Sequence, residues 1–286
     1  MLERERALRR LLGTATSNPH IGRVIIADNG EGSRREVYQE DWDCEVDVLD
    51  LPFDAGIGAC RSAVAEELDS EFLCVVDSDM EIPANIETLV EILHRDPDLG
   101  AVSGILEEHG RIRAGVTDFR EETLFRGRTA LVQGIADEKT VDWDCGYPVA
   151  RADKLPNAMV VRRACVEDYS WDRRLKDKEH LDWFLGHWQE TDWEFGVTPS
   201  VIFRHHTSTG NSMYDHRWRH ENKERQERWR EELLEKWDYD ALVHGDSRWF
   251  DSGRRPVSER VWKALAGELP TKVSKPVKSA VERVIA

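Results

Sequence analysis

The chain has 286 residues, 40% of them hydrophobic, which is enough for one large domain or for one domain plus an appendage. Its net charge of −16 argues against nucleic acid as a partner, because phosphate backbones bind basic surfaces. Five cysteines without a CxxC pair predict reduced thiols rather than a disulfide framework or a structural zinc site. No apolar run approaches the roughly 18 residues of a membrane span, and the start lacks the features of a signal peptide, so a cytoplasmic protein is expected.

The N-terminal part of the chain predicts one helix and two short strands. Leucines spaced along an arginine-rich stretch predict a helix over residues 2–17. A buried strand is expected at 23–27, and it stops at Asp28 in an Asp-Asn-Gly turn. Alternating apolar and acidic residues predict a second strand at 45–49.

A glycine-bearing turn then opens a helix that runs through Leu68. Gly56 and Gly58 allow the backbone to approach a ligand closely, and the start of a helix favours an anion. No Gly-Lys-Ser/Thr follows, so this is not a Walker loop. A plain junction between a loop and a helix explains the same residues equally well.

The apolar run at 72–76 is followed directly by Asp77, Ser78 and Asp79. A short run of this composition predicts a strand buried on both faces. Ligands bind at the carboxyl ends of such strands, and two carboxylates one residue apart suit a divalent cation that carries a diphosphate. The alternative is an Asx turn that caps a helix starting near Pro83.

The remaining strands and helices alternate at a spacing typical of βαβ units, which predicts an α/β fold with a mainly parallel sheet. Between 106 and 150 the pattern is looser and predicts a single edge strand. The expected elements are a helix at 83–94, strands at 99–105, 158–161 and 195–202, and the edge strand at 129–135.

Two later stretches carry candidate functional residues. On a helix that begins near residue 179, Glu179, Asp182 and Trp183 would share one face, opposite an apolar face. These carboxylates are candidates for catalysis or, alternatively, simple partners of the helix dipole. The strand at 195–202 leads into His205 and His206, which are either metal-ligand candidates or surface residues.

The C-terminal part differs from the rest in its charge. Residues 214–237 predict a strongly charged helix. Residues 254–286 hold eight Lys or Arg against three Glu, and the spacing of their apolar residues fits a basic amphipathic helix. Such a helix either lies on anionic lipid, as a peripheral contact with the inner face of the membrane, or docks on its own domain. The predicted division is a domain at 1–212 and a helical extension at 213–286.

Taken in order, these features resemble the GT-A nucleotide-sugar glycosyltransferases of the family 2 type, most closely the branch that contains the β-1,4-N-acetylgalactosaminyltransferases. The resemblance covers roughly residues 2–210 and implies a Rossmann-like, mostly parallel sheet with flanking helices. The stretches that carry it are Ile26-Ala27-Asp28, Gly56 to Arg61, Val76 to Asp79, His180 to Leu185 and Arg204 to Ser208.

The resemblance implies how the matched residues would bind a nucleotide-sugar donor. Asp28 would contact the nucleobase, and Arg61 would contact the uracil or the phosphates. Gly58 lies in the same turn as Arg61 and would line the donor site. Asp77 would bind the ribose.

The resemblance also implies a cation and a general base. Asp79 and His206, with Asp77 beside them, would ligate Mn²⁺ or Mg²⁺ bridging the diphosphate. Asp182, or alternatively Glu179, would take the proton from the acceptor hydroxyl while the anomeric carbon is inverted in one displacement.

The chain departs from that family in two places. Ser78 stands where the family has the middle aspartate of a triplet, and the sequence opens in the first helix rather than in the central strand that precedes it. Either the recorded start is late, or the sheet lacks a central strand and part of the base pocket.

The expected function is metal-dependent, inverting transfer of a sugar from a nucleoside-diphosphate sugar to a glycan or lipid-linked acceptor. A UDP-sugar is the expected donor. One alternative is a degenerate homologue that binds a sugar nucleotide or a partner without catalysis. The other is a sugar-nucleotide pyrophosphorylase, although the Gly-rich basic loop of such enzymes is absent from this sequence.

Overall fold

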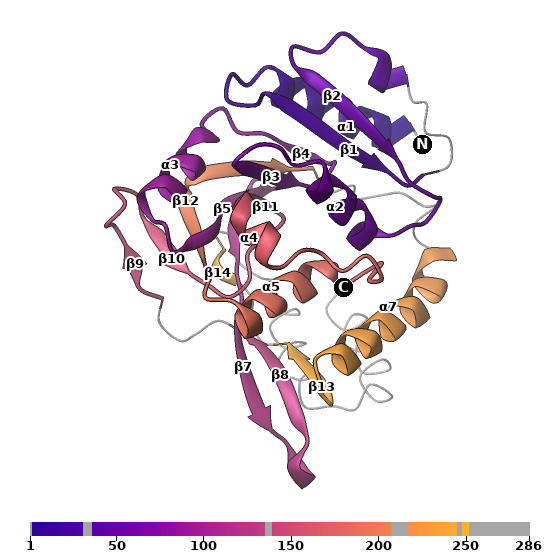
Figure 1. The fold of residues 1–286 in the computed structure, drawn as a ribbon, viewed down its shortest axis with the longest axis vertical. Helices are drawn as coiled ribbons and strands as arrows, with labels where there is room; N and C mark the ends of the chain where they lie inside the picture. Colours follow the sequence, from indigo (N-terminus) through magenta and orange to yellow (C-terminus); the bar gives the residue numbers. More distant parts are fainter. Residues whose placement is uncertain (1, 31–35, 135–138, 207–216, 245–247, 252–286) are drawn as a thin grey trace, which may run out of the picture. The chain divides into compact units, whose positions relative to one another are not determined.

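The computed structural model describes residues 2–30, 36–134, 139–206, 217–244 and 248–251 (Figure 1). The described residues up to Phe250 belong to one compact unit. Within the described residues, no helix is both long enough and apolar enough to cross a membrane. The helices are α1 (Leu2–Thr16), α2 (Ile57–Glu66), α3 (Glu87–Arg95), α4 (Arg163–Asp168), α5 (Glu179–Glu190) and α7 (Arg217–Lys236).

The largest sheet has nine strands and is flanked by helices, which confirms the predicted α/β class (Figure 1). Its long strands follow one another by hydrogen bonding in the order β3 (Phe72–Val76), β11 (Ala158–Arg162), β5 (Leu99–Glu108) and β12 (Glu194–His205). Its shorter strands are β4 (Met80–Glu81), β6 (Arg111–Gly115), β9 (Val141–Asp142), β10 (Val149–Arg151) and β14 (Arg248–Asp251).

Side chains alternate between two apolar cores on the two faces of this sheet. On β11, Met159 and Val161 belong to the core that also contains residues of α4, α5 and α7, whereas Ala158 and Val160 belong to the core that contains residues of α1 and α3. Because successive residues of a strand point to opposite faces, one apolar run supplies both cores. The predicted strand at 158–161 is confirmed. In β3, the run predicted to be buried on both faces, only Val75 is buried and the other residues are partly buried.

The prediction of a mainly parallel sheet is wrong for this sheet. β5 and β12 are parallel, but β11 runs antiparallel to both β3 and β5, between which it lies. The chain reaches β11 only after the long excursion that follows β5, so the connection does not impose the direction of a βαβ unit. An apolar run signals burial on both faces, and it carries no information about strand direction.

A second sheet contains two parallel strands, β1 (Arg23–Asp28) and β2 (Glu45–Asp50). Among the described strands, β1 pairs with β2 alone and β3 pairs with β11 alone, and none lies between β1 and β3. The apolar residues of β1 are therefore only half-buried, although their sequence is typical of an interior strand.

The third sheet has the order β13-β8-β7, with β7 (Asp118–Thr123), β8 (Thr129–Gly134) and β13 (Ala241–His244). β7 and β8 form an antiparallel hairpin that extends away from the large sheet, and β13 pairs with β8 in parallel (Figure 1). The predicted strand at 129–135 is therefore confirmed, but its prediction as an edge strand is wrong. Its second neighbour follows α7, more than a hundred residues later in the chain, and the local pattern could not reveal it.

Helix α5 is buried around most of its circumference, and a histidine is enclosed with it. His187 is 0% exposed, and its ring contacts the rings of Trp183 and Phe195 at centroid distances of 4.4 and 5.5 Å. Its Nδ1 lies 3.0 Å from the hydroxyl of Thr191. Burial lowers the pKa of His187 from 6.5 to about 4, because the imidazolium would lose its hydration.

We expect this histidine to make the fold sensitive to acid. Because the pKa of His187 is lower in the folded state, the unfolded chain takes up a proton first as the pH falls. The stability that the neutral His187 gives the fold is therefore complete above pH 6.5 and is lost as the pH falls towards 4. His187→Gln should remove this dependence on pH. Between pH 7 and pH 4, the free energy of unfolding should therefore fall by about 3 kcal/mol less in the variant than in wild type. Urea unfolding across this range measures the difference. His20→Gln, at a half-exposed histidine, is the control, and parallel profiles for wild type and His187→Gln would contradict the prediction.

Candidate functional site

Arg61 of α2 joins charged residues that come from three separate parts of the chain. Its Nη1 is 3.0 Å from Glu179 Oε1 on α5, and its Nη2 is 3.7 Å from Asp77 Oδ1 at the end of β3. The same Nη1 lies 3.4 Å from His180 Nδ1. The structure thus brings together Arg61, Asp77 and Glu179, three residues that the sequence singled out.

The carboxyls of Glu179 and Asp77 both lie where the ionised form is disfavoured. Burial raises the pKa of Glu179, which is only 3% exposed, and the charge of Arg61 offsets this in part. Burial also raises the pKa of Asp77, although the charge of Arg61 lowers it in part. The neighbouring Asp79 raises this pKa further by charge repulsion. Added positive charge at this end of β3 would relieve that repulsion.

Asp79 lies next to a histidine, but the histidine is His205 and not His206. His205 Nε2 is 3.3 Å from Asp79 Oδ1, and His205 Nδ1 is 2.7 Å from Glu108 Oε1. The hydrogen bond with Asp79 raises the pKa of His205 to about 9 despite partial burial, and Glu108 adds to the effect.

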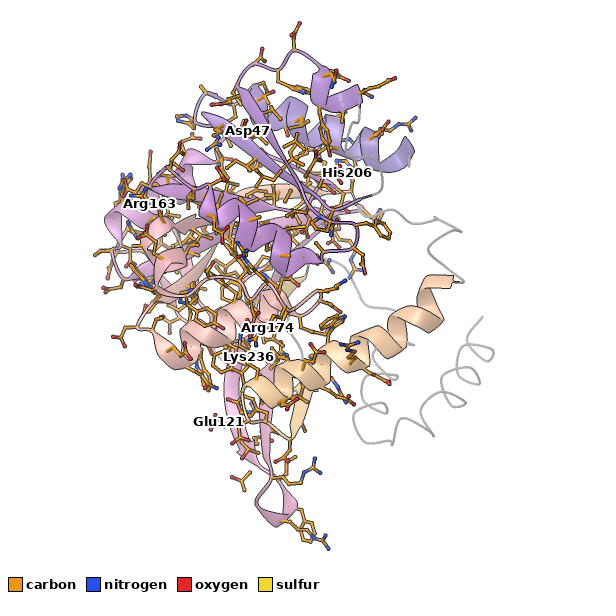
Figure 2. All side chains as sticks on the ribbon, turned by 45° about the vertical axis from the view of Figure 1, so that its right-hand side comes forward. Asp47, Glu121, Arg163, Arg174, His206 and Lys236 are labelled. Atoms are coloured by element: carbon orange, nitrogen blue, oxygen red, sulfur yellow. The ribbon has the colours of Figure 1, made fainter. Side chains whose placement is uncertain are left out.

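His206, labelled in Figure 2, faces a different carboxylate. Its Nε2 is 2.6 Å from Glu81 Oε1, and its backbone N–H donates to the carbonyl of Asp79 at 2.9 Å. Adjacent residues at the end of a strand point to opposite sides, so His205 and His206 cannot both face Asp79. The predicted role of His206 as a metal ligand stays a prediction, and the structure adds His205 as the histidine nearer to Asp79.

The described residues contain no group of three or more His, Cys, Asp or Glu side chains close enough to hold a metal ion. Asp79 Oδ1 and His205 Nε2, 3.3 Å apart, nevertheless have the spacing of two adjacent ligands, because bonds of roughly 2.1 Å at right angles place ligand atoms about 3 Å apart. Mg²⁺ and similar cations commonly take one or two protein ligands and complete their shell with water and substrate phosphates. The residues present therefore fit a divalent cation whose remaining ligands are water or substrate phosphates.

The two glycines at the start of α2 have a packing role. A Cβ at Gly58 would collide with the carbonyl oxygens of Asp172 and Leu175, and Gly56 adopts a φ of +95° against Lys176. The N–H of Gly58 donates to the carbonyl of Leu175 at 3.2 Å. This close contact explains the glycines without a ligand, and the predicted part of Gly58 in donor binding stays a prediction.

Asp28 is buried at the end of β1. Its Oδ1 accepts the N–H of Gly30 at 2.9 Å, which makes the Asx turn that the Asp-Asn-Gly sequence predicts. Its Oδ2 accepts the hydroxyl of Tyr38 at 2.7 Å. These bonds fix the carboxylate in place, and its contact with a nucleobase stays a prediction.

Asp182 is 0% exposed, and side chains from the end of α7 enclose it. Its Oδ1 accepts Trp237 Nε1–H at 2.8 Å, and its Oδ2 accepts Lys236 Nζ at 2.9 Å. The hydroxyl of Tyr169 donates at 3.3 Å. Glu179 and Asp182 are thus neighbours on one helix with separate partners, because Glu179 faces Arg61.

Lys236 joins this buried carboxylate to the surface (Figure 2). Its Nζ also donates to Asp172 Oδ2 at 3.0 Å, and Arg174, labelled beside Lys236, bonds the same carboxylate. These bonds hold the pKa of Asp172 well below its usual range, the hydrogen bond from Arg174 being the largest cause.

The residues of these clusters that were not predicted from the sequence include Glu108, Lys236 and Trp237. Glu108 does carry a signal, since it is an acidic residue at the end of a long apolar strand. Lys236 and Trp237 carry none, because each is one of several similar residues in a charged helix. Only the packing of α7 against α5 distinguishes them.

No protein-family model and no curated protein matches this chain. Among solved structures, S. aureus TarS 1–349 in complex with UDP-GlcNAc matches with a TM-score of 0.51 and 15% identity, over 74% of this chain and 58% of that chain. The same TarS segment with UDP matches with a TM-score of 0.49 and 16% identity, over 72% of this chain and 58% of that chain. GalNAc-T7 with UDP, GalNAc and Mn²⁺ matches with a TM-score of 0.48 and 16% identity, over 65% of this chain and 38% of that chain. This chain thus spans less than two thirds of each of these structures. Its central mixed sheet with flanking helices is a fold similar to that of the GT-A glycosyltransferases.

Proposed function

We propose that this protein is a glycosyltransferase that uses a nucleoside-diphosphate sugar, with a UDP-sugar as the expected donor. The observation that carries the proposal is the cluster at the carboxyl end of β3, where Asp77 and Asp79 lie beside Arg61 and His205. Donor ligands of open α/β sheets bind at this end of the strands. The fold similarity to GT-A structures supports the same reading.

In the proposed site, Asp79 and His205 hold a divalent cation, with Asp77 beside them. When bound, Mn²⁺ or Mg²⁺ would neutralise the diphosphate of the donor and so stabilise the leaving group. Arg61 supplies a fixed positive charge beside Asp77, with its Nη2 3.7 Å from Asp77 Oδ1. The protein residues thus orient the diphosphate and balance its charge as the bond between the sugar and the diphosphate breaks.

We assign the general base to Glu179 in preference to Asp182. Glu179 is on the Arg61 side of α5, where the donor would bind, and its raised pKa suits a group that accepts a proton near neutral pH. Asp182 already accepts three hydrogen bonds from Trp237, Lys236 and Tyr169. The proton of the acceptor hydroxyl would pass to Glu179 as the hydroxyl oxygen attacks the anomeric carbon, which gives inversion in one step.

The acceptor is proposed to be a glycan or a lipid-linked sugar. A peripheral contact with the inner face of a membrane through residues 254–286 is part of that proposal and rests on their basic, amphipathic sequence. Those residues lie outside the described part of the structure.

A second candidate function is a non-catalytic homologue that binds a sugar nucleotide or a partner protein. The half-buried β1 and the open edges of β1 and β3 among the described strands favour this candidate, because Asp28 at the end of β1 is the proposed contact to the nucleobase. If the contact to the nucleobase were lost, the residues proposed to bind the diphosphate would remain, but the donor would bind only weakly.

Calorimetric titration with UDP, GDP and their common sugars, with and without Mn²⁺, tests the proposed function. We expect wild type to bind a UDP compound in the presence of Mn²⁺, and Asp79→Ala to weaken this binding at least about 100-fold, the scale of a lost charged interaction of roughly 3 kcal/mol. Glu122→Ala, which removes an exposed carboxylate on the distant β7, should bind like wild type. If wild type binds none of these nucleotides under any condition, the donor-site proposal fails. If it binds one but transfers no sugar to any acceptor, the non-catalytic candidate is favoured.

A further inference from the structure

Glu108, the last residue of β5, is a buried carboxylate shared between two basic side chains. Its Oε1 lies 2.7 Å from His205 Nδ1 and also accepts a hydrogen bond from Arg113 Nη2. The two parallel strands pair Arg204 with Glu107 in register, so Glu108 and His205 follow directly as neighbours across the β5–β12 ladder. The histidine is therefore oriented by a partner that belongs to the central sheet.

The orientation decides which ring nitrogen is available to a ligand. A cation that binds a histidine replaces the proton on one ring nitrogen, and a carboxylate beside Nδ1 keeps the remaining proton on Nδ1. The lone pair then resides on Nε2, which is the nitrogen 3.3 Å from Asp79 Oδ1. Carboxylate, histidine and cation in this sequence form the usual arrangement by which proteins orient a metal-binding imidazole.

We propose that Glu108 is a positioning residue that holds His205 in the tautomer and orientation needed to bind a divalent cation jointly with Asp79. Arg113 holds the Glu108 carboxylate from its other side. The inference rests on the proposed cation site and extends it to a residue that does not touch the cation.

Glu107 offers a matched control on the same strand. It too is an acidic residue in an ion pair, with its Oε2 3.1 Å from Arg204 Nε. As the neighbouring residue of a strand it points to the opposite face, away from His205. Glu107→Ala and Glu108→Ala thus remove the same charge from adjacent positions.

The experiment measures Mn²⁺ binding to the full chain by electron paramagnetic resonance of the free ion, with no nucleotide present. Paramagnetic broadening of the His205 ring signals in ¹⁵N-histidine spectra identifies the site. Metal-free spectra recorded above the His205 pKa of about 9, where the ring is neutral, report the tautomer. We expect Glu108→Ala to lower Mn²⁺ affinity 10–100-fold, the usual effect of removing such a partner, and to mix the tautomers. Glu108→Gln, whose amide oxygen can still accept the Nδ1 proton, should recover most of the affinity, and Glu107→Ala should retain it.

Each other outcome overturns the inference or separates it from the proposed function. Equal Mn²⁺ affinity in Glu108→Ala and wild type would overturn it, as would His205 signals that Mn²⁺ does not broaden in wild type. An equal loss in Glu107→Ala would also overturn it, since charge alone would then explain the effect. If Mn²⁺ binds at His205 but the loaded protein binds no nucleotide, the donor proposal fails while the role of Glu108 stands.

Discussion

Replacing Glu179 with glutamine is expected to lower the rate of sugar transfer by about 10²–10⁴, the range that general-base catalysis contributes. Glutamine keeps the size of the side chain and can still accept a hydrogen bond from Arg61, but it cannot take a proton at neutral pH. Donor affinity should therefore change by a few fold at most, and the loss should fall on kcat. Turnover at saturating donor and acceptor is the measurement.

The pH dependence of turnover by the wild-type protein should report the ionisation of Glu179. A base must be ionised, so turnover falls as the pH falls through its pKa, and burial places the pKa of Glu179 above its ordinary value of 4.5. The acid limb of the profile should therefore begin above pH 4.5 and should be absent from the residual activity of Glu179→Gln.

Two further variants make the assignment decisive. Glu190→Gln changes an exposed glutamate at the end of the same helix and should retain full activity. Asp182→Asn tests the carboxylate that the sequence favoured. If Asp182→Asn loses as much kcat as expected of Glu179→Gln, at unchanged stability, while Glu179→Gln stays active, then Asp182 is the base and the assignment from the structure is wrong.

The pair Glu179 and Asp182 shows how far a sequence can carry the prediction of a site. Spacing of three residues correctly places both on neighbouring positions of one helix. It cannot show what packs against each position, and here the partners are Arg61 of α2 and Lys236 of α7, far apart in the chain. The residue types were predictable, whereas the role of each depends on contacts that only the tertiary structure makes.

The two histidines illustrate a related limit. That a strand would end in His205 and His206 was predictable from the apolar run before them. Which of the two faces Asp79 depends on the register of β12 with β4, where His205 pairs with Met80. A shift of one residue would exchange them, and the local sequence does not fix that register.

Replacing Lys236 with methionine is expected to lower the free energy of unfolding by about 3–5 kcal/mol, because it leaves the carboxylate of Asp182 buried without its cation. Burial alone would lower the pKa of Lys236, but hydrogen bonds with Asp182 and Tyr169 outweigh it and raise this pKa. The ammonium is therefore firmly charged in the folded protein. Urea unfolding at pH 7 measures the change.

The cost should arise from the unpaired charge and not from the lost side chain, and two comparisons separate these causes. Arg228→Met removes a cation from an exposed ion pair with Glu232 on the same helix and should cost at most about 1 kcal/mol. The double variant Lys236→Met/Asp182→Asn should recover most of the loss, since an amide costs less to bury than a carboxylate. If Lys236→Met alone costs under 1 kcal/mol, Asp182 does not depend on α7 for its charge, and it becomes available as a base again. A stability measurement on α7 therefore bears directly on which carboxylate of α5 is free to accept a proton.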